Sequence, residues 1–379
     1  MPIDFSKVPS PCYVLDEQLL VNNLQLIQNV SKASGAEIIL AYKGFAMWSI
    51  FPLIRQYITG ASASSLFEAR LAFEEMKTLA HTYSPAYNEK DFSDVMKYSS
   101  HITFNSLTQY EKFLPFIQQF PKEISIGLRV NPEFSEVTTE LYNPCAPGSR
   151  LGLIAEQLPK ELPPHIEGLH FHTLCESSSY DLEKTLNAFI EKFGHYLPQI
   201  KWLNMGGGHL MTRKGYDVEH LISIIKRFKE TYGIHVILEP GSAFALETGY
   251  LISTILDVVE NKGIKTAILD VSFTAHMPDC LEMPYQPLIL SAIDYNKDAF
   301  TYRMGGNSCL SGDYMGNWSF EKELKPGDQI LFNDMIHYTM VKTSTFNGVQ
   351  HPSIGVWNDE EGFRLIRQFN YEDYKNKLS

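Results

Sequence analysis

The chain has 379 residues, of which 44% are hydrophobic and 20% charged, a composition typical of globular domains. Its formal charge of −12 disfavours a nucleic-acid partner, which requires a basic surface, and is compatible with attraction of a cationic small molecule. No apolar run reaches the roughly 20 residues of a membrane-spanning helix, so we expect no membrane partner.

The five cysteines favour a reducing environment. They are odd in number, scattered, and never spaced as Cys-x-x-Cys, which argues against a disulfide framework and against a structural zinc site. The N-terminus also lacks the basic start and apolar core of a signal peptide. We therefore expect a cytoplasmic protein.

After a strand candidate at 11–15, with Asp16 as the cap of a following helix, the chain alternates between short apolar runs and amphipathic segments. Eight such units in little more than 200 residues predict an α/β fold with a (β/α)8 TIM-type barrel over residues 17–246. A doubly wound open sheet is the alternative. The strand candidates are 37–41, 57–61, 78–83, 101–104, 124–130, 166–171, 201–204 and 235–238, and helical patterns include 66–76, 106–118, 180–193 and 218–232.

Beyond about residue 246 the helical periodicity fades, and glycines and prolines punctuate short strand-like runs. We expect a C-terminal all-β domain formed by residues 1–16 and 247–379, which the strand at 11–15 joins. A long loop at 131–150 is expected over one end of the barrel. The strand candidates of this domain are 250–259, 266–271, 286–292, 300–305, 329–331 and 362–367.

Lys43 follows the first barrel strand candidate, at the strand end where barrel enzymes carry their catalytic groups. Its amine could form a Schiff base with a carbonyl compound if burial or a neighbouring charge leaves it partly unprotonated. On this segment alone, an exposed lysine at a strand end is the better interpretation.

Three further motifs fall at predicted carboxyl ends of barrel strands. His170 and His172 lie two residues apart, share one face of a strand, and could bind a metal or simply lie in the core. A triple glycine at 206–208 could leave backbone amides free for a phosphate. Glu239, in the sequence Glu-Pro-Gly-Ser, is a carboxylate that could bind a ligand or only backbone amides.

Taken together, these motifs provide an amine for an aldehyde, amides for a phosphate, a ring for stacking and a carboxylate for a ring nitrogen, which are the needs of pyridoxal 5′-phosphate (PLP). The arrangement resembles the fold-type III PLP enzymes, which include alanine racemase and ornithine and diaminopimelate decarboxylases. The resemblance covers almost the whole chain. It implies a PLP-binding barrel followed by a β domain, and a homodimer with active sites at the subunit boundary.

Within that group, the chain is most similar to the carboxynorspermidine/carboxyspermidine decarboxylases, through the strings at 148–152, 172–176 and 276–285. The segment 305–313 resembles the family's cysteine loop, and 337–348 resembles its late tyrosine segment. Ser242 stands where ornithine and diaminopimelate decarboxylases have arginine, and Leu174-Cys175 stands where they have Gly-Ser. Both departures disfavour ornithine, diaminopimelate and arginine as substrates.

The resemblance implies roles for individual residues. Lys43 would bind PLP, Glu239 would keep its ring nitrogen protonated, and His172 would stack on its ring. Cys309 of the other subunit would protonate Cα after loss of CO2, because a cysteine thiol is mostly protonated at neutral pH. The predicted catalytic residues are thus Lys43, His172, Glu239 and Cys309, and the further cofactor-binding residues are Gly206, Gly207, Gly208, Gly241, Ser242 and Tyr338.

The substrate implied by the resemblance is a carboxylated polyamine, carboxynorspermidine or carboxyspermidine. Its cationic amines need acidic partners, for which Asp279, Glu282 and the opposite subunit's copy of Asp313 are candidates, although each could be a solvated loop carboxylate. Glu239 and Arg150 complete the predicted substrate-binding set, and Arg129 could touch the cofactor or the substrate carboxylate. No metal is predicted.

Other classes of function remain open. The chain could be a PLP-dependent decarboxylase or racemase of another basic amino acid, although we identify no second base opposite Lys43. It could be a non-catalytic polyamine-binding regulator, which would not need Lys43, Glu239 and Cys309 together. A metal-dependent hydrolase ranks last. The two named substrates differ by one methylene, worth only ~1–3 kcal/mol in a pocket, so the sequence does not separate them.

Overall fold

The computed structural model describes residues 3–379 and divides into two compact units. The barrel unit comprises Asn23–Phe244, and the sheet unit comprises the residues up to Asn22 together with Ala245–Ser379. The first long helix, α1 (Glu17–Ser34), crosses the boundary between them.

The barrel unit contains a parallel sheet in the order β2-β10-β9-β8-β7-β6-β5-β4-β3. β2 and β3 are two pieces of one strand, interrupted at Ile39. The Ile39 amide donates to Leu238 O of β10 (2.9 Å), and the Leu40 amide donates to Gly60 O beside β4 (3.1 Å). This strand therefore pairs on both sides, and the sheet closes into an eight-stranded barrel. The predicted barrel is confirmed, and the open sheet is excluded.

The strand bounds of the barrel are β2 (Glu37–Ile38), β3 (Leu40–Ala41), β4 (Ala61–Ala63), β5 (Ala80–Tyr83), β6 (Ser99–Phe104), β7 (Ser125–Arg129), β8 (Ile166–His170), β9 (Trp202–Asn204) and β10 (His235–Leu238).

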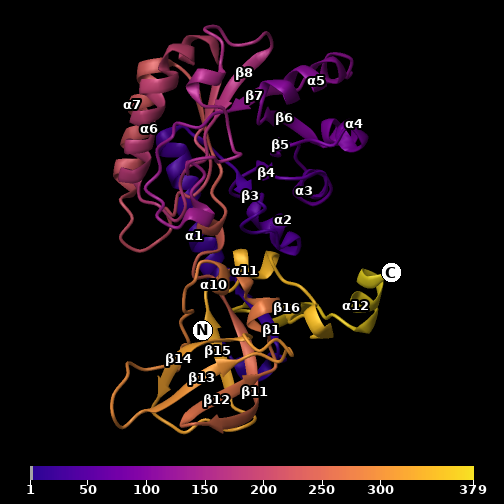
Figure 1. The fold of residues 1–379 in the computed structure, drawn as a ribbon, viewed down its shortest axis with the longest axis vertical. Coiled ribbons are helices and arrows are strands. Elements are labelled where there is room, and N and C mark those ends of the chain that lie inside the picture. Colours follow the sequence, from indigo (N-terminus) through magenta and orange to yellow (C-terminus); the bar gives the residue numbers. More distant parts are fainter. Residues whose placement is uncertain (1–2) are drawn as a thin grey trace. The chain divides into compact units, whose positions relative to one another are not determined.

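Helices cover the outside of these strands (Figure 1). Their apolar faces pack on the sheet; for example, Phe104 of β6 stacks on Phe113 of α5, and Phe92 of α4 joins the same cluster. The predicted helix at 218–232 is observed with those bounds as α7. The helix bounds are α2 (Phe51–Ile54), α3 (Leu66–Leu71), α4 (Glu89–Tyr98), α5 (Leu107–Gln118), α6 (Ser179–Phe193), α7 (Val218–Tyr232) and α8 (Ser242–Ala245).

Two local predictions in the barrel differ from the structure. The strand predicted at 57–61 is wrong in position, because the amides of Tyr57 and Ile58 bond to Ile54 O and continue the turn after α2; β4 begins only at Ala61. The helix predicted at 66–76 is α-helical only as far as Leu71, the end of α3, and continues to Met76 as a π-helical turn. The loop at 131–150 is confirmed and contains only the short 3-10 turn Glu140–Tyr142.

The sheet unit contains a mostly antiparallel sheet in the order β14-β13-β12-β11-β1-β16-β17, with β15 paired to β11. β1 lies antiparallel to β11 and parallel to β16, so the N-terminal strand joins this sheet as predicted. The bounds are β1 (Cys12–Asp16), β11 (Gly249–Asn261), β12 (Ile264–Leu269), β13 (Phe300–Gly305), β14 (Tyr314–Phe320), β15 (Gln329–Asn333), β16 (Ser353–Asn358), β17 (Gly362–Arg367), α9 (Phe273–His276), α10 (Pro278–Glu282), α11 (Tyr338–Val341) and α12 (Tyr371–Leu378).

The strand predicted at 286–292 is wrong. This segment makes only an isolated bridge between Ile289 and Phe332, and Pro287 cannot donate a hydrogen bond to a regular ladder. Two observed strands were not predicted. In β14, Gly316 and Asn317 weaken the strand pattern, and pairing with β13 overrides that weak local preference. The second, β16, pairs with β1 on one side and with β17 on the other.

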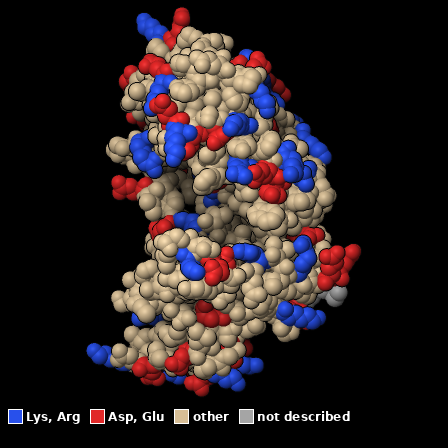
Figure 2. All heavy atoms as spheres, turned by 90° about the vertical axis from the view of Figure 1, so that its right-hand side faces the viewer, with Lys and Arg blue, Asp and Glu red and all other residues tan. Residues whose placement is uncertain are grey.

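The charged side chains follow no single-sign pattern. Figure 2 shows acidic and basic residues interspersed over one face, without a continuous basic stripe on that face. No helix within residues 3–379 combines the length and apolarity that crossing a bilayer requires.

Candidate active site

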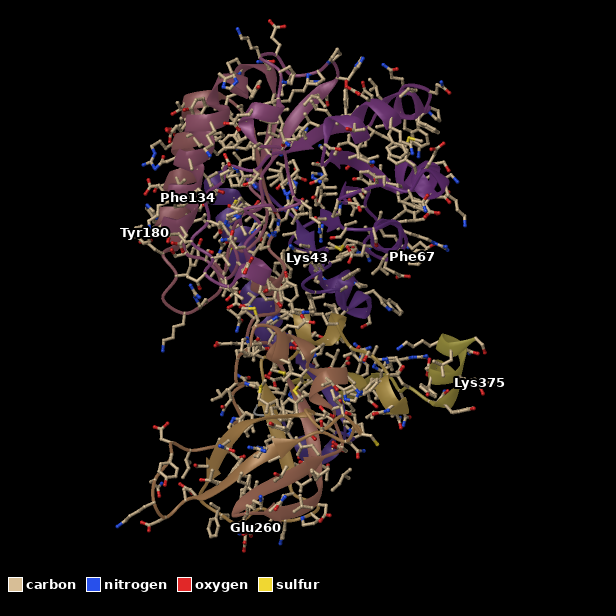
Figure 3. All side chains as sticks on the ribbon, in the orientation of Figure 1. Lys43, Phe67, Phe134, Tyr180, Glu260 and Lys375 are labelled. Carbon is tan, nitrogen blue, oxygen red and sulfur yellow. The ribbon has the colours of Figure 1, made fainter. Side chains whose placement is uncertain are left out.

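Lys43 lies in the turn directly after β3, at the carboxyl ends of the barrel strands. A Cβ atom on Gly44 would lie 2.8 Å from the Cα of Gly241, so two glycines let this turn touch the loop after β10 that carries Glu239. In the view of Figure 3, Lys43 lies near the centre, with Tyr180 of α6 to its left and Phe67 of α3 to its right. The close approach brings two predicted motifs together.

The triple glycine follows β9 and packs between the His172 segment and Glu239. A Cβ atom on Gly206 would meet Phe171 O at 2.6 Å, one on Gly207 would meet Glu239 O at 2.4 Å, and one on Gly208 would meet Leu174 O at 2.3 Å. Gly206 and Gly208 also have positive φ values of 70° and 85°. Glycine is thus required here by the packing of the turn itself, a reason that the sequence did not indicate.

His172 connects the triple glycine to Lys43. The Gly207 amide donates to His172 Nδ1 (3.1 Å), and Lys43 Nζ lies 2.9 Å from His172 Nε2. Because Nδ1 accepts a hydrogen bond, a neutral His172 carries its proton on Nε2. An Nε2–H group requires an acceptor, and an ammonium group has none. The network therefore favours Lys43 as an uncharged amine.

Burial and a neighbouring charge also favour the uncharged form of Lys43. Lys43 remains accessible to solvent, but loss of hydration to the surrounding protein and the charge of Arg129 lower its pKa to about 8, against the opposing charge of Glu239. Burial and the charges of Lys43 and Arg129 lower the pKa of His172 well below its usual value, so His172 is neutral. A neutral imidazole next to a partly neutral lysine suits condensation with an aldehyde.

Glu239 is buried, with only 5% of its surface exposed. Asn204 Nδ2 donates to Glu239 Oε1 (2.7 Å), and Asn204 Oδ1 accepts from the Gly206 amide (2.8 Å). Burial raises the pKa of Glu239, while the bond from Asn204 and the charge of Lys43 oppose this rise. Asn204 thus couples the carboxylate to the triple-glycine turn.

Arg129 belongs to the same cluster, although it was only loosely assigned from the sequence. It ends β7, is 6% exposed, donates from Nη2 to His172 O (3.1 Å), and lies over the Tyr83 ring at 4.6 Å. Tyr83 donates from its hydroxyl to Asn105 Oδ1 (2.8 Å). An arginine near the end of the predicted strand 124–130 was the signal available in the sequence.

Arg150 lies on the loop above this end of the barrel. Its carbonyl accepts from Asn105 Nδ2 (2.8 Å), and the nearby Gly152 amide donates to Asn105 Oδ1 (2.8 Å). The loop is thereby anchored beside Tyr83, while the Arg150 side chain is exposed. A substrate-binding role for Arg150 stays a prediction.

His170, His172 and Glu239 offer ligand-type atoms within 4.8 Å of one another, which is the arrangement a metal ion would need. Both nitrogens of His172 are already engaged, by the Gly207 amide and by Lys43. The Arg129 guanidinium also reaches the cluster, and its charge opposes binding of a further cation. These contacts favour an organic ligand over a metal.

A second group of predicted residues gathers within the sheet unit. Asp279, 5% exposed, accepts on Oδ2 from Tyr285 (2.7 Å) and Thr339 (2.9 Å), and its Oδ1 has no hydrogen-bond partner within residues 3–379. No lysine, arginine or histidine of the described chain forms an ion pair with it. A buried carboxylate with one open oxygen is costly unless a cation binds there.

Cys309 is exposed on its loop, and its amide donates to Asn347 Oδ1 (2.9 Å) of the late tyrosine segment. Asp313 holds this loop in place. Its Oδ1 accepts from the Thr274 amide and its Oδ2 from the Ser308 amide, both at 3.1 Å. Asp313 thus has a structural role in each chain, and its predicted contact with the substrate of the opposite subunit stays untested.

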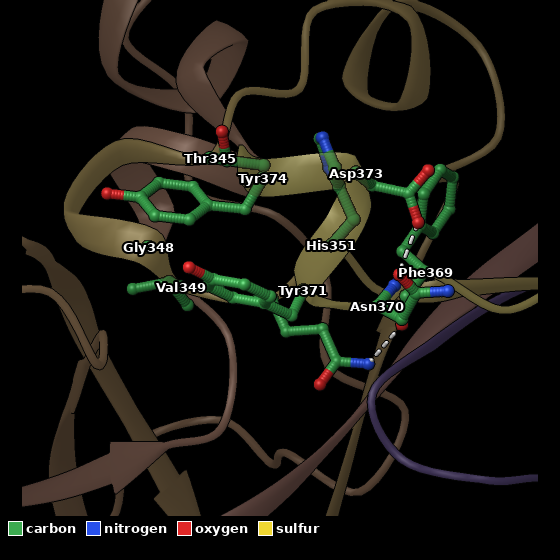
Figure 4. A pocket seen from close by; sticks show the side chains of 10 residues that line it. Thr345, Gly348, Val349, His351, Phe369, Asn370, Tyr371, Asp373 and Tyr374 are labelled. Carbon is green, nitrogen blue, oxygen red and sulfur yellow. Dashed lines mark hydrogen bonds between the residues drawn. The ribbon is translucent and has the colours of Figure 1, made fainter. Parts of the chain in front are cut away.

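Glu282 forms an ion pair with Lys342, and Tyr338 begins α11 next to Thr339. The segments 276–285, 305–313 and 337–348 therefore lie together in the sheet unit, tied by the bonds to Asp279 and Asn347. A separate hollow of about 230 Å³ lies beside α12, between Tyr371 and Tyr374 (Figure 4). It is lined by none of the predicted site residues, and we assign it no role in the reaction.

Comparisons with known proteins agree with this geometry. The family of pyridoxal-dependent decarboxylases, described as "Pyridoxal-dependent decarboxylase, C-terminal sheet domain", matches residues 12–336. The barrel, its lysine and the appended sheet define a decarboxylase of this class, and the chain belongs to that family.

The relatives are similar over their whole length. The chain is 50% identical to carboxyaminopropylagmatine decarboxylase of Synechocystis, over 98% of this chain and 96% of the relative. It is 44% identical to carboxynorspermidine/carboxyspermidine decarboxylase of Campylobacter jejuni, over 98% of both. A crystal structure of carboxynorspermidine decarboxylase from Campylobacter jejuni, complexed with norspermidine, superimposes with a TM-score of 0.90 at 42% identity, covering 98% of this chain and 100% of that one.

Proposed function

We propose that this protein is a PLP-dependent carboxy-lyase that removes the α-carboxylate from a carboxylated polyamine, carboxynorspermidine or carboxyspermidine, releasing CO2. The observation that carries the proposal is the network in which the Gly207 amide and His172 favour the uncharged form of Lys43 beside the buried Glu239. The full-length relatives that act on carboxynorspermidine and carboxyspermidine support the choice of substrate.

The residues at the barrel end fit PLP. No acceptor within residues 3–379 receives the amide hydrogen of Gly208 or of Ser242, whereas the amides of Gly206 and Gly207 already donate to the chain. Gly208 and Ser242 would therefore bind the phosphate, and Tyr338 is a further predicted contact. Lys43 would hold the aldehyde carbon and Glu239 the ring nitrogen.

When bound, PLP supplies an electron sink for the pair left on Cα as CO2 departs. Glu239 favours a protonated ring nitrogen through its negative charge, which that sink requires. His172 keeps its neutral ring fixed between Gly207 and Lys43. Arg129 adds a buried positive charge that suits an anionic group of the cofactor or substrate.

We further propose that the enzyme is a cytoplasmic homodimer with shared sites, in which Cys309 of the partner subunit donates a proton to Cα. The exposure of Cys309 on an anchored loop supports donation across a subunit boundary. The five unpaired thiols support a reducing compartment.

Asp279 is the proposed site for a cationic amine of the substrate. Its Oδ2 already accepts two hydrogen bonds, so the buried Oδ1 is the oxygen that still lacks a partner and would receive the amine. A compact ammonium group can be bound by one oxygen, whereas a guanidinium group is bound best by two. Asp279 therefore favours an ammonium group over a guanidinium.

A second candidate substrate is carboxyaminopropylagmatine, because the 50%-identical relative bears that activity in its name. Agmatine ends in a guanidinium group. The two candidates thus differ in the cation that the enzyme must recognise, and they can be separated by direct assay.

The first test is turnover of all three carboxylated substrates by the PLP-loaded protein, with release of CO2 as the measurement. We expect kcat/KM to be highest for carboxynorspermidine or carboxyspermidine. Lys43→Ala should lose the absorbance of covalently bound PLP and at least about a thousandfold in kcat. Turnover of none of the three substrates by the wild type would refute the proposal.

The second test concerns Asp279. Asp279→Asn should raise KM at least about tenfold with little change in PLP affinity, since Asp279 is not among the residues expected to bind PLP. Tyr285→Phe frees a lone pair on Oδ2 and should raise the ratio of kcat/KM for carboxyaminopropylagmatine over carboxynorspermidine. An unchanged ratio in Tyr285→Phe would show that Asp279 does not select the cation.

A further inference from the structure

His170 is a buried histidine to which the proposed reaction gives no role. It ends β8, is 2% exposed, and neither ring nitrogen has a hydrogen-bond partner within residues 3–379. A buried polar group left without a partner costs about 1–3 kcal/mol. Such a residue calls for an explanation in terms of a nearby acceptor or ligand.

The acceptor within reach is Glu239. His170 Nε2 lies 3.8 Å from Glu239 Oε2, the carboxylate oxygen opposite the one bound by Asn204. The Tyr83 ring meets the His170 ring edge-on at 5.6 Å, and the Tyr83 hydroxyl is itself bonded to Asn105. The Tyr83 ring packs against the imidazole on one side, and an approach of roughly 1 Å between Nε2 and Oε2 would close an ordinary hydrogen bond.

The charges around His170 set its protonation state. Burial, Arg129 and Lys43 lower the pKa of His170 well below its usual value, so the ring is neutral and carries one N–H donor. Burial also raises the pKa of Glu239, while side-chain hydrogen bonds from Asn204 and Ser62 and the charges of Lys43 and Arg129 oppose this rise. Hydrogen bonds to the charged form of a carboxylate counter that effect, and His170 is placed to provide one.

We propose that His170 is a positioning residue that donates from Nε2 to Glu239 Oε2. Together with Asn204 on Oε1, it holds both carboxylate oxygens and keeps Glu239 ionised to receive the ring nitrogen of PLP. The inference rests on the proposed function for its consequence in the reaction, but the proposed hydrogen bond involves barrel residues alone and can be tested without the cofactor.

The test compares three variants. His170→Phe keeps a flat ring and removes the donor, His170→Gln restores an N–H donor, and His170→Leu replaces the Phe variant should that protein fail to fold. His81→Phe is the matched control, because His81 is also buried on a barrel strand but lies near the start of β5 rather than at a strand end beside Glu239.

The first measurement uses cofactor-free protein, in which the Glu239 carboxyl is titrated by ¹³C NMR. Loss of one hydrogen bond to a charged group should raise the titration midpoint by about one pH unit in His170→Phe. The midpoint should return towards wild type in His170→Gln and stay unchanged in His81→Phe.

The second measurement uses PLP-loaded protein. His170→Phe should lower kcat about tenfold with little change in KM, and should move the acidic limb of the kcat–pH profile upwards, with rescue by His170→Gln.

Equal Glu239 titration midpoints in wild type and His170→Phe would overturn the inference. Equal midpoints and equal kcat values in His170→Phe and His170→Gln would also overturn it. Failure of the wild type to bind PLP or to release CO2 would instead refute the proposed function, and the cofactor-free titration would still decide the role of His170.

Discussion

At the scale of single residues, the chemistry of the barrel site depends on the direction of its hydrogen bonds, that is, on which nitrogen atom carries the proton. Gly207 places the proton of neutral His172 on Nε2, and this favours the uncharged form of Lys43, whose Nζ lies 2.9 Å away. In the same turn, the Gly206 amide donates to Asn204 Oδ1, and Asn204 Nδ2 donates to Glu239 Oε1. One glycine turn thus influences both the amine and the carboxylate.

We expect Gly206→Ala to be strongly destabilising. Gly206 has φ +70°, and a Cβ atom would meet Phe171 O at 2.6 Å and His172 Cα at 2.7 Å. The left-handed backbone costs roughly 1–2 kcal/mol for alanine, and the overlap adds about as much again. Urea unfolding should therefore show a loss of about 3 kcal/mol, together with weaker PLP binding.

Gly215→Ala is the control for that measurement. Gly215 has φ +82°, but an added methyl group would have no heavy atom within 4 Å, so only the backbone cost of about 1 kcal/mol applies. Equal losses in the two variants would show that the close packing of the triple glycine does not matter.

At the scale of elements, the two ends of the barrel strands differ in their chemistry. The carboxyl ends carry the site, whereas the amino-terminal halves of β5 and β6 carry His81 and His101, whose rings lie 3.8 Å apart. At the starts of β2 and β10, Glu37 pairs with His235 at 2.9 Å. His81, His101 and His235 have no part in the proposed reaction, but protonation of this cluster should lower the stability of the protein in acid.

Burial, followed by the charge of His101, lowers the pKa of His81 from 6.5 to about 3 in the folded protein. The unfolded chain therefore binds more protons between these values, and stability is lost as pH falls below about 6.5. Between pH 6.5 and 5 this one residue should cost about 1.5 kcal/mol. His81→Gln should remove that part of the pH dependence, measured as the free energy of unfolding at each pH.

The control for this measurement is His195→Gln, because His195 is exposed. An identical pH dependence of the unfolding free energy in His81→Gln and wild type would contradict the prediction.

At the scale of the whole molecule, the predicted site residues are divided between two units. Lys43, His172 and Glu239 belong to the barrel unit, and Asp279, Cys309 and Tyr338 belong to the sheet unit. If the sites are shared between subunits as proposed, one chain can supply the lysine and the other the cysteine.

Mixing Lys43→Ala with Cys309→Ala under exchange conditions should therefore restore activity. Random pairing makes about half of the dimers hybrid, and each hybrid holds one complete site, so roughly a quarter of wild-type activity is expected. The controls are the two variants assayed alone at the same concentration. Activity no greater than their average would show that each chain uses its own cysteine.

The sequence by itself determined the alternation of strands and helices, because burial on a barrel imposes regular hydrophobic periods that are local in the chain. It also singled out Lys43, His172, Glu239, Asp279 and Cys309 as site residues, whose roles stay predictions, since strand ends and unusual strings are readable one segment at a time. The start of β4, the strand β14 and the failed strand at 286–292 were missed, because pairing partners rather than local preference decide them.

Only the tertiary structure decided the chemical states of those residues. The preference of Lys43 for its uncharged form depends on Gly207 and His172, and the place of Asp313 depends on the amides of Thr274 and Ser308. Asp279 keeps Oδ1 without a partner because Tyr285 and Thr339 both donate to Oδ2. The partners in these contacts range from 5 to 129 positions apart in the chain. Protonation and hydrogen bonding depend on distance in space, and a linear pattern of residue types does not contain that distance.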